Sequence, residues 1–230
     1  MSFNIGTGIS VSTNINKIST IGLIGQKGSG KTHALKVFSE EIKKKEFDQI
    51  IIDPIGVIRG EIPKITVKSL NPDYLFKIIS EKAIIVDLSY LTQKEKVEFV
   101  DLLCSELQTI QEKRLYLLID EIQEFLPQKR GRYSQELERL IRIGRNFNIG
   151  FIFTSQRVQS VDKNVIELVD LFLIFRNAYP LSLKILKEIL QYHIPDKKTL
   201  SNLIKHIQSL DTGKCIIYAP QLTEKELEEA

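Results

Sequence analysis

Short apolar runs alternate along the chain with longer segments in which apolar residues recur at helical spacing. The runs are continuous and rich in β-branched residues, as expected for strands that are buried on both faces of a parallel sheet. The pattern therefore predicts an α/β fold, with a doubly wound, mostly parallel sheet flanked by helices. We expect strands at residues 20–24, 50–53, 83–87, 115–120, 149–154, 171–175 and 214–218.

Capping signals place several helices between these strands. A helix is expected at 31–45, and Thr92 can cap another that runs through Glu112. The apolar positions of the second helix include Leu91, Val97 and Leu102. Beyond Pro180, the pattern predicts two more helices before the last strand.

A further helix should begin at Ser134 and has two distinct faces. Its apolar stripe is formed by Leu137, Leu140 and Ile141. Arginines recur at every third position on a different face: Arg139, Arg142 and Arg145. A basic face of this kind points toward a partner or toward water.

Length and composition describe one sizeable domain. The chain has 230 residues, of which 43% are hydrophobic and 27% charged, so it can bury a core of its own. We expect a single domain over 1–230, with an N-terminal extension at 1–19 and an acidic C-terminal tail at 222–230. A net charge of +3 is too small to indicate a nucleic-acid partner by itself.

The sequence carries no signal for export, a membrane span or a zinc site. Cys104 and Cys215 have neither CxxC spacing nor a histidine at metal-ligand distance. The longest apolar runs have the length of strands, and the N-terminus lacks a signal-peptide pattern. We therefore expect a cytoplasmic protein that is not itself transmembrane. Many Ile, Lys and Glu residues, with one Met and no Trp, favour a thermophilic source.

The sequence GQKGSGKT at 25–32 follows an apolar run and opens a helical segment, which is the context that a phosphate-binding P-loop requires. Its glycines let the backbone amides turn toward a β-phosphate. Lys31 would reach the β- and γ-phosphates, and the Thr32 hydroxyl would bind Mg²⁺ at the helix N-terminus. The residues expected to bind ATP here are Gly25, Gln26, Lys27, Gly28, Ser29, Gly30, Lys31, Thr32 and His33.

Residues 115–121, LYLLIDE, form an apolar strand that ends in two acids. Asp120 is suited to hold Mg²⁺ in the manner of a Walker B aspartate. Glu121 can polarise a water for attack on the γ-phosphate, which favours hydrolysis over phosphoryl transfer to a metabolite. Together the two motifs predict an ATPase that uses Mg²⁺.

The segment at 142–157, RIGRNFNIGFIFTSQR, resembles the helix end, strand and terminal S-Q-R that follow Walker B in the HerA/FtsK superfamily of DNA-pumping ATPases. Asn148 stands where that family usually has glycine, and Asn also tolerates a left-handed backbone. Shorter similarities are DPIG at 53–56, VDLS at 86–89 and FLIFR at 172–176. The resemblance extends over nearly the whole chain and implies a RecA/FtsK-like P-loop NTPase core.

This resemblance implies roles for two further residues. Gln156 has the position of the family's polar sensor, which hydrogen-bonds the γ-phosphate or the attacking water. Arg145 has the position of the arginine finger, a cation presented to the nucleotide of a neighbouring subunit, and Arg142 and Arg176 are alternatives. A finger in trans implies a homo-oligomeric ring, either a pentamer or a hexamer. The competing interpretation is that these arginines form a solvated helix face.

The loop at 127–133, PQKRGRY, directly follows the Walker B acids and carries three cations beside a glycine and an aromatic residue. This combination suits sequence-independent contact with the phosphates of DNA in a central channel. A short basic loop can also be merely solvated. The DNA-contact candidates are Lys129, Arg130 and Arg132.

The resemblance also implies a function, namely ATP-driven translocation of double-stranded DNA. With only residues 1–19 before the first core strand, the chain is similar to the minimal genome-packaging ATPases of archaeal and bacterial viruses with internal membranes. Such a motor would work in the host cytoplasm or with the virion, and a capsid, portal or membrane protein would be a further partner.

Three alternatives remain open at this point. The chain could be a plasmid or cellular HerA-like translocase in conjugation, segregation or DNA-end processing. It could instead be a nucleotide-dependent switch that binds proteins and does not move DNA. An AAA+ module is the third alternative, although the stretch after Phe175 is short for the helical lid of that class.

Overall fold

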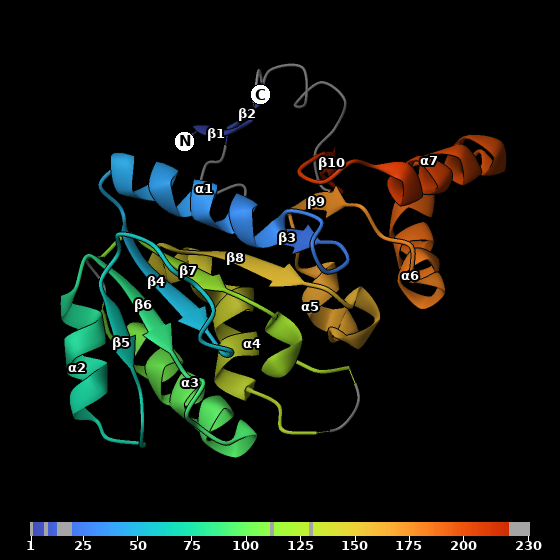
Figure 1. Cartoon of the computed structure of the whole chain (residues 1–230). Helices are drawn as coiled ribbons and strands as arrows, with labels where there is room; N and C mark the ends of the chain where they lie inside the picture. The colour runs from blue at the N-terminus through green and yellow to red at the C-terminus, as the bar shows by residue number, and fades with distance from the viewer. Residues whose placement is uncertain (1, 7–8, 13–19, 111–112, 129–130, 221–230) are drawn as a thin grey trace.

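A computed structural model describes residues 2–6, 9–12, 20–110, 113–128 and 131–220 of the chain, with side chains from residue 20 onward. Its centre is an eight-stranded sheet (Figure 1). From one edge to the other, the strands are β10 (Cys215–Tyr218), β9 (Leu171–Phe175), β3 (Thr20–Ile24), β8 (Ile149–Ser155), β7 (Leu115–Ile119), β4 (Asp48–Asp53), β6 (Ala83–Asp87) and β5 (Lys64–Thr66). All neighbouring pairs are parallel except β9 and β10. The predicted mostly parallel sheet is confirmed.

Every predicted strand is present in this sheet, and the bounds of β3, β6 and β9 agree with the prediction. The edge strand β5 was not predicted. It contains only three residues and directly follows Pro63, so it is too short to show a periodic pattern.

Helices cover both faces of the sheet (Figure 1). Each face has its own apolar core. One core lies against α1 (Lys31–Lys44). The other lies against α2 (Asp73–Ser80), α3 (Gln93–Leu107), α4 (Gln135–Ile143), α6 (Pro180–Gln191) and α7 (Lys197–Ser209). Because successive side chains of a strand point to opposite faces, Ile51 belongs to the first core while Ile50 and Ile52 belong to the second.

The predicted cap of α3 is confirmed. The Thr92 hydroxyl accepts from the Glu95 N–H at 3.4 Å, and the Glu95 carboxylate accepts from the Thr92 N–H at 2.8 Å, which completes a capping box. Two details were wrong. The helix ends at Leu107 rather than continuing toward 112, and Leu102 is 45% exposed. Its buried face consists of Val97, Phe99, Val100, Leu103, Cys104 and Leu107.

The helix α4 begins after Ser134 and buries the predicted apolar stripe. Its arginines lie on an exposed face, where both pair with carboxylates about one turn earlier on the same helix. Arg139 pairs with Glu136 at 3.6 Å, and Arg142 pairs with Glu138. A 3-10 turn, η2 (Gly144–Phe147), then leads to Asn148, whose φ of 56° confirms the expected left-handed backbone.

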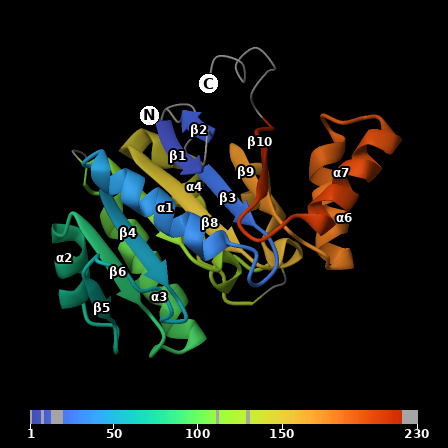
Figure 2. The same ribbon diagram turned by 45° about the horizontal axis from the view of Figure 1, so that its top comes forward.

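The remaining elements are short. Two strands of the N-terminal extension, β1 (Ser2–Gly6) and β2 (Ile9–Ser12), form an antiparallel pair, and β1 lies beside α1 (Figure 2). The other helical segments are η1 (Ile122–Glu124), η3 (Val158–Ser160) and α5 (Lys163–Glu167). Within the described ranges, no helix is both long and apolar enough to cross a membrane. The predicted acidic tail at 222–230 lies outside them.

Candidate nucleotide site

The P-loop lies at the carboxyl edge of the sheet, between β3 and α1 (Figure 1). Its first two backbone amides donate hydrogen bonds to carbonyls at the ends of the two strands beside β3. The Gly25 N–H donates to the Ser155 carbonyl at 3.2 Å, and the Gln26 N–H donates to the Arg176 carbonyl at 2.9 Å. Ser155 ends β8 and Arg176 follows β9. The loop is therefore held at the edge where open α/β sheets bind their ligands.

The glycines of the loop are required by its geometry. Gly28 and Gly30 have φ values of 76° and 112°, in the left-handed region that favours glycine. A Cβ on Gly25 would lie 2.7 Å from the Cβ of Phe175. None of the three positions accepts a side chain without strain, as expected for a phosphate-binding nest.

Lys31 is almost fully buried, with 5% of its surface exposed. Its Nζ donates to the Gln26 carbonyl at 3.0 Å, across the loop. Burial lowers the pKa of this ammonium, and the nearby carboxylates of Glu121 and Asp120 act in the opposite direction. The ammonium of Lys31 in the P-loop therefore interacts electrostatically with the carboxylates of both Walker B acids.

Asp120 and Glu121 follow β7 and are bridged by Thr154 of the neighbouring strand β8. The Thr154 hydroxyl donates to Asp120 Oδ1 at 2.6 Å and accepts from the Glu121 N–H at 2.9 Å. Burial raises the pKa of Asp120, whereas the hydrogen bond from Thr154 lowers it. A buried carboxylate of this kind is stabilised by a bound cation.

Glu121 is 5% exposed and has a left-handed backbone with a φ of 52°. Gln156 donates to its carboxylate twice: from the backbone N–H to Oε2 at 3.2 Å, and from the side-chain amide to Oε1. Gln123 donates to Oε2 at 2.5 Å. The structure therefore brings the two predicted residues together and adds Gln123. Sequence reasoning missed Gln123 because a glutamine two residues beyond an acid carries no spacing signal.

These groups fit a nucleoside triphosphate with Mg²⁺. Thr32 and His33 are exposed in the first turn of α1. Mg²⁺ prefers oxygen ligands and usually takes one or two carboxylates together with substrate phosphates. A hydroxyl from Thr32, the buried carboxylate of Asp120, and a glycine loop carrying the Lys31 ammonium form such a donor set.

Arg145 does not lie with these residues. Its Nη2 pairs with Asp170 Oδ1 at 2.5 Å, and Asp170 Oδ2 accepts from the Thr20 N–H at 2.9 Å. Thr20 begins β3, whereas the P-loop follows the other end of that strand. At about 3.3 Å per residue, the two ends of β3 are roughly 13 Å apart. Arg145 is therefore at the sheet edge opposite the P-loop of its own subunit.

The basic loop after η1 is closed at its base. The Ser134 N–H donates to the Phe125 carbonyl at 3.0 Å, and the Gln128 N–H donates to the Ser160 carbonyl at 2.9 Å. Arg132 is exposed. Two of the predicted DNA-contact residues lie outside the described residues: Lys129 and Arg130.

The turn before β10 also contacts the P-loop, which the sequence did not indicate. The Gly213 N–H donates to the Ser29 carbonyl at 2.9 Å, and the Thr212 hydroxyl lies 3.5 Å from the Gly28 carbonyl. Within the described part of the chain, the buried side-chain atoms without a hydrogen-bond partner belong to the P-loop or to the segment that follows β9: Ser29 Oγ, Arg176 Nε and Asn177 Nδ2. Such atoms are rare in folded proteins and mark a place where a ligand or water is expected.

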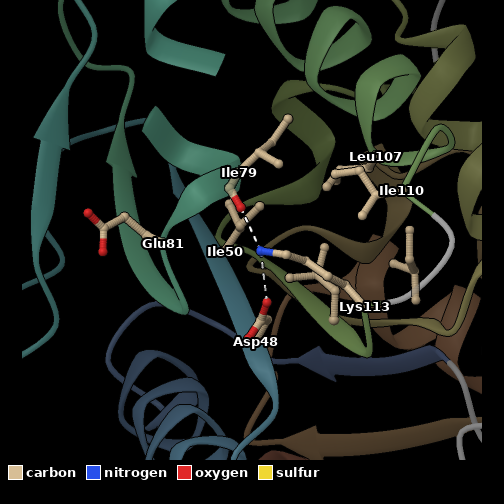
Figure 3. A pocket seen from close by; sticks show the side chains of 9 residues that line it. Asp48, Ile50, Ile79, Glu81, Leu107, Ile110 and Lys113 are labelled. Carbon is tan, nitrogen blue, oxygen red and sulfur yellow. Dashed lines mark hydrogen bonds and ion pairs between the residues drawn. The ribbon is translucent and has the colours of Figure 1, made fainter. Parts of the chain in front are cut away.

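A small cavity at the amino edge of the sheet is separate from this site (Figure 3). Its lining includes the first residues of β4, β7 and β8, which are Asp48, Leu115 and Ile149. Lys113 Nζ pairs with Asp48 at 3.1 Å and donates to the Ile79 carbonyl at 2.7 Å. With a volume of about 10 Å³, the cavity holds at most about one water and cannot hold a nucleotide.

Fold and site together define a P-loop nucleotide-binding domain. In a comparison with protein families, residues 19–161 match the family described as AAA domain. The match covers more than half of the chain, so the chain belongs to this family. The matched region runs from β3 through η3 and ends before α5, α6 and α7, so it does not include the stretch after Phe175.

Solved structures share this fold over most of the chain. The genome packaging NTPase B204 from Sulfolobus turreted icosahedral virus 2, in complex with ATP-gammaS, is 20% identical with a TM-score of 0.64 and covers 90% of this chain and 94% of its own. The DNA-packaging ATPase B204 from Sulfolobus turreted icosahedral virus is 21% identical with a TM-score of 0.64 and covers 89% and 93%.

A weaker match is the pCW3 conjugation coupling protein TcpA, which is 14% identical with a TM-score of 0.51 and covers 75% of this chain and 53% of its own. At such identities the likeness establishes the shared fold. The predicted resemblance to DNA-motor ATPases is confirmed at that level. Among curated proteins, none matches the chain.

Proposed function

We propose that the chain is an ATPase that translocates double-stranded DNA and packages a viral genome. The observation that carries this proposal is the group formed at the ends of β7 and β8, where Gln156 contacts Glu121 close to Lys31 of the P-loop. A carboxylate base beside a polar sensor and a phosphate-binding lysine suits hydrolysis of a γ-phosphate. The DNA substrate is supported by the likeness in fold to a viral packaging NTPase over 90% of this chain.

Each residue of the site has a chemical task in this proposal. The P-loop amides and Lys31 bind and orient the phosphates. Bound by Thr32 and Asp120, Mg²⁺ would neutralise charge on the β- and γ-phosphates. Glu121 would orient a water and accept its proton, and Gln156 would hydrogen-bond the γ-phosphate or that water. Positioning and charge stabilisation of this kind account for most of the catalysis of phosphoryl transfer.

A homo-oligomeric ring, a pentamer or hexamer, would complete the site. Arg145 is too far from the P-loop of its own subunit, but in a ring its sheet edge can face the P-loop edge of the next subunit. The side chain of Arg145 is 41% exposed although it pairs with Asp170, so part of this side chain is accessible to a neighbouring subunit. Acting in trans, such an arginine contributes about 10³- to 10⁵-fold in rate.

The basic loop would couple hydrolysis to DNA. Five residues, η1 with Phe125 and Leu126, separate Glu121 from this loop along the chain, so a change at the γ-phosphate can reach the loop through a short segment. Its cations would contact DNA phosphates without reading sequence. Lys129, Arg130 and Arg132 are the proposed contacts. A capsid, portal or membrane protein would be the further partner of a motor working in the host cytoplasm or with the virion.

The test is the ATPase rate with and without long double-stranded DNA, measured across protein concentration and salt. We expect DNA to stimulate hydrolysis, and the stimulation to fall steeply between about 50 and 200 mM salt because bound phosphates release counterions. Lys31→Ala should abolish hydrolysis, and Glu121→Gln should abolish it while ATP binding is retained. Normal turnover in either variant refutes the site. Hydrolysis that ignores DNA at every salt concentration favours the protein-binding switch instead.

A plasmid or cellular translocase is the second candidate. It is supported by the likeness in fold to a conjugation coupling protein, which covers 75% of this chain. DNA stimulation alone does not separate the two candidates, because both track phosphates. Binding to a purified capsid or portal protein, compared with binding to a conjugation-channel component, distinguishes them.

A further inference from the structure

We propose that Gln123 is a positioning residue for hydrolysis. It anchors one oxygen of the Glu121 carboxylate, so that the other oxygen is released toward water when the Gln156 side chain turns to the nucleotide. This inference rests on the proposed function, in which Glu121 is the general base.

The two oxygens of Glu121 are held in different ways. Oε2 accepts from the Gln123 side-chain amide at 2.5 Å and from the Gln156 backbone N–H at 3.2 Å. Each carboxylate oxygen offers about two acceptor sites, so Oε2 is saturated. Oε1 accepts from the side-chain amide of Gln156. Two donors therefore fix Oε2, whereas the contact to Oε1 depends on the side chain of Gln156 alone.

Gln123 is itself oriented by a chain of hydrogen bonds. The Arg157 N–H donates to Ser155 Oγ at 3.1 Å, and the Ser155 hydroxyl donates to Gln123 Oε1 at 2.9 Å. Because the Gln123 oxygen is occupied by this donor, its amide nitrogen must face Glu121. Hydrogen bonds aligned head to tail strengthen one another. The backbone carbonyl of Ser155 also accepts from Gly25, so the same residue supports the P-loop.

The backbone of Glu121 has an unfavourable conformation that the surrounding contacts must hold. A glutamate with a φ of 52° persists only where its surroundings fix it. Thr154 fixes its N–H at 2.9 Å, and Gln123 fixes its carboxylate. In the conformation described, Gln156 occupies Oε1, so this oxygen is not fully available to a water. When the Gln156 side chain binds the γ-phosphate instead, Oε1 loses its donor while Oε2 keeps both of its own.

The experiment compares Gln123→Met with Gln191→Met. Met has nearly the length of Gln but no amide, and Gln191 is an exposed residue at the end of α6, far along the chain from the site. For Gln123→Met we expect kcat to fall by about 10- to 100-fold, because a misplaced catalytic group loses a near-attack geometry. KM for ATP and the Kd for a non-hydrolysable analogue should remain close to wild type, whereas the Tm should fall by roughly 3–12 °C because one hydrogen bond to a buried carboxylate is lost. Gln191→Met should match wild type throughout.

Ser155→Ala provides a second, milder variant. It removes the hydroxyl that orients Gln123 and keeps the backbone contact to Gly25. We expect a smaller fall in kcat, and in combination with Gln123→Met no further fall, because both act through the same hydrogen-bond chain. Fully additive losses would contradict a shared chain.

The outcomes separate this inference from the proposed function. If wild type hydrolyses ATP and Glu121→Gln does not, but Gln123→Met retains the wild-type kcat, the anchor is refuted and the site stands. A rise in KM or Kd that matches the loss of kcat refutes the anchor as well, because it indicates a general disturbance of the pocket. If wild type does not hydrolyse ATP, the proposed function itself fails.

Discussion

Thr154→Val tests how the two Walker B acids are held. Valine has the shape of threonine but lacks the hydroxyl. In the folded chain Thr154 is fully buried, and its hydroxyl bonds both to Asp120 at 2.6 Å and to the Glu121 N–H at 2.9 Å. The variant therefore removes one donor from a buried carboxylate and leaves a buried N–H without this acceptor.

The magnitude follows from these two losses. A hydrogen bond to a charged group contributes about 1.5–3 kcal/mol, and a buried donor without an acceptor costs about 1–3 kcal/mol. Because local relaxation recovers part of the sum, we expect the free energy of unfolding to fall by about 2–4 kcal/mol. For a chain of this size, at about 2–4 °C per kcal/mol, this lowers Tm by roughly 4–16 °C.

The deficit should depend on pH. Burial raises the pKa of Asp120 above its usual 3.8, and the Thr154 hydrogen bond lowers it again. For a carboxyl with a raised folded pKa, the stability contributed by its protonation is present below the unfolded pKa and is lost as the pH rises through the folded pKa. Removing the hydroxyl raises the folded pKa further and enlarges that loss. The Thr154→Val deficit should therefore be largest at neutral pH and shrink as the pH falls through the raised pKa of Asp120.

The assay is urea unfolding followed by circular dichroism at several pH values. Thr154→Ser is the matched control, since it keeps the hydroxyl and loses only one methyl group, for about 1 kcal/mol. A Thr154→Val protein as stable as Thr154→Ser at neutral pH refutes the reasoning. A deficit that is independent of pH refutes the electrostatic part of it.

Three further predictions concern charged groups. Asp120→Asn should abolish hydrolysis. Because it removes a buried charge, it should also raise the free energy of unfolding of the nucleotide-free protein by roughly 1 kcal/mol and its Tm by about 2–4 °C. A lowered Tm in thermal melts would contradict this. Arg145→Ala should bind ATP but not hydrolyse it, and mixing it with Glu121→Gln should restore some turnover at mixed interfaces; no rescue in the mixed ATPase assay counts against a finger in trans. Lys64 pairs with the buried Asp53 at 3.5 Å and with Asp87 at 3.0 Å. Lys64→Met should therefore lower the free energy of unfolding, measured in urea, by about 3 kcal/mol. A decrease below about 1 kcal/mol would show that the two carboxylates do not need this lysine.

Local signals were sufficient for much of the fold. The strands β3, β6 and β9 were predicted with their bounds, because a continuous apolar run between turn residues is a property of neighbouring positions. The cap at Thr92 and the left-handed backbone at Asn148 also depend on contacts within a few residues. The P-loop belongs to the same group, since its glycines are required by the turn itself.

Local sequence signals did not predict the contacts between segments that are distant along the chain. Gln123 reaches Glu121 through an orientation imposed by Ser155, which follows 32 positions later along the chain. The edge strand β5 and the exposed Leu102 were missed, because short strands and helix rotation depend on what packs against them.

Arg145 illustrates the division most clearly. The sequence by itself placed an arginine after α4 at a position similar to an arginine finger, and it predicted a nucleotide site formed by a P-loop and two acids. Only the tertiary structure decided that Asp170 holds this arginine at the start of β3, at the opposite sheet edge from the P-loop. The physical reason is that residue types and spacing specify local chemistry, whereas the strand order, which no local pattern encodes, determines which groups meet.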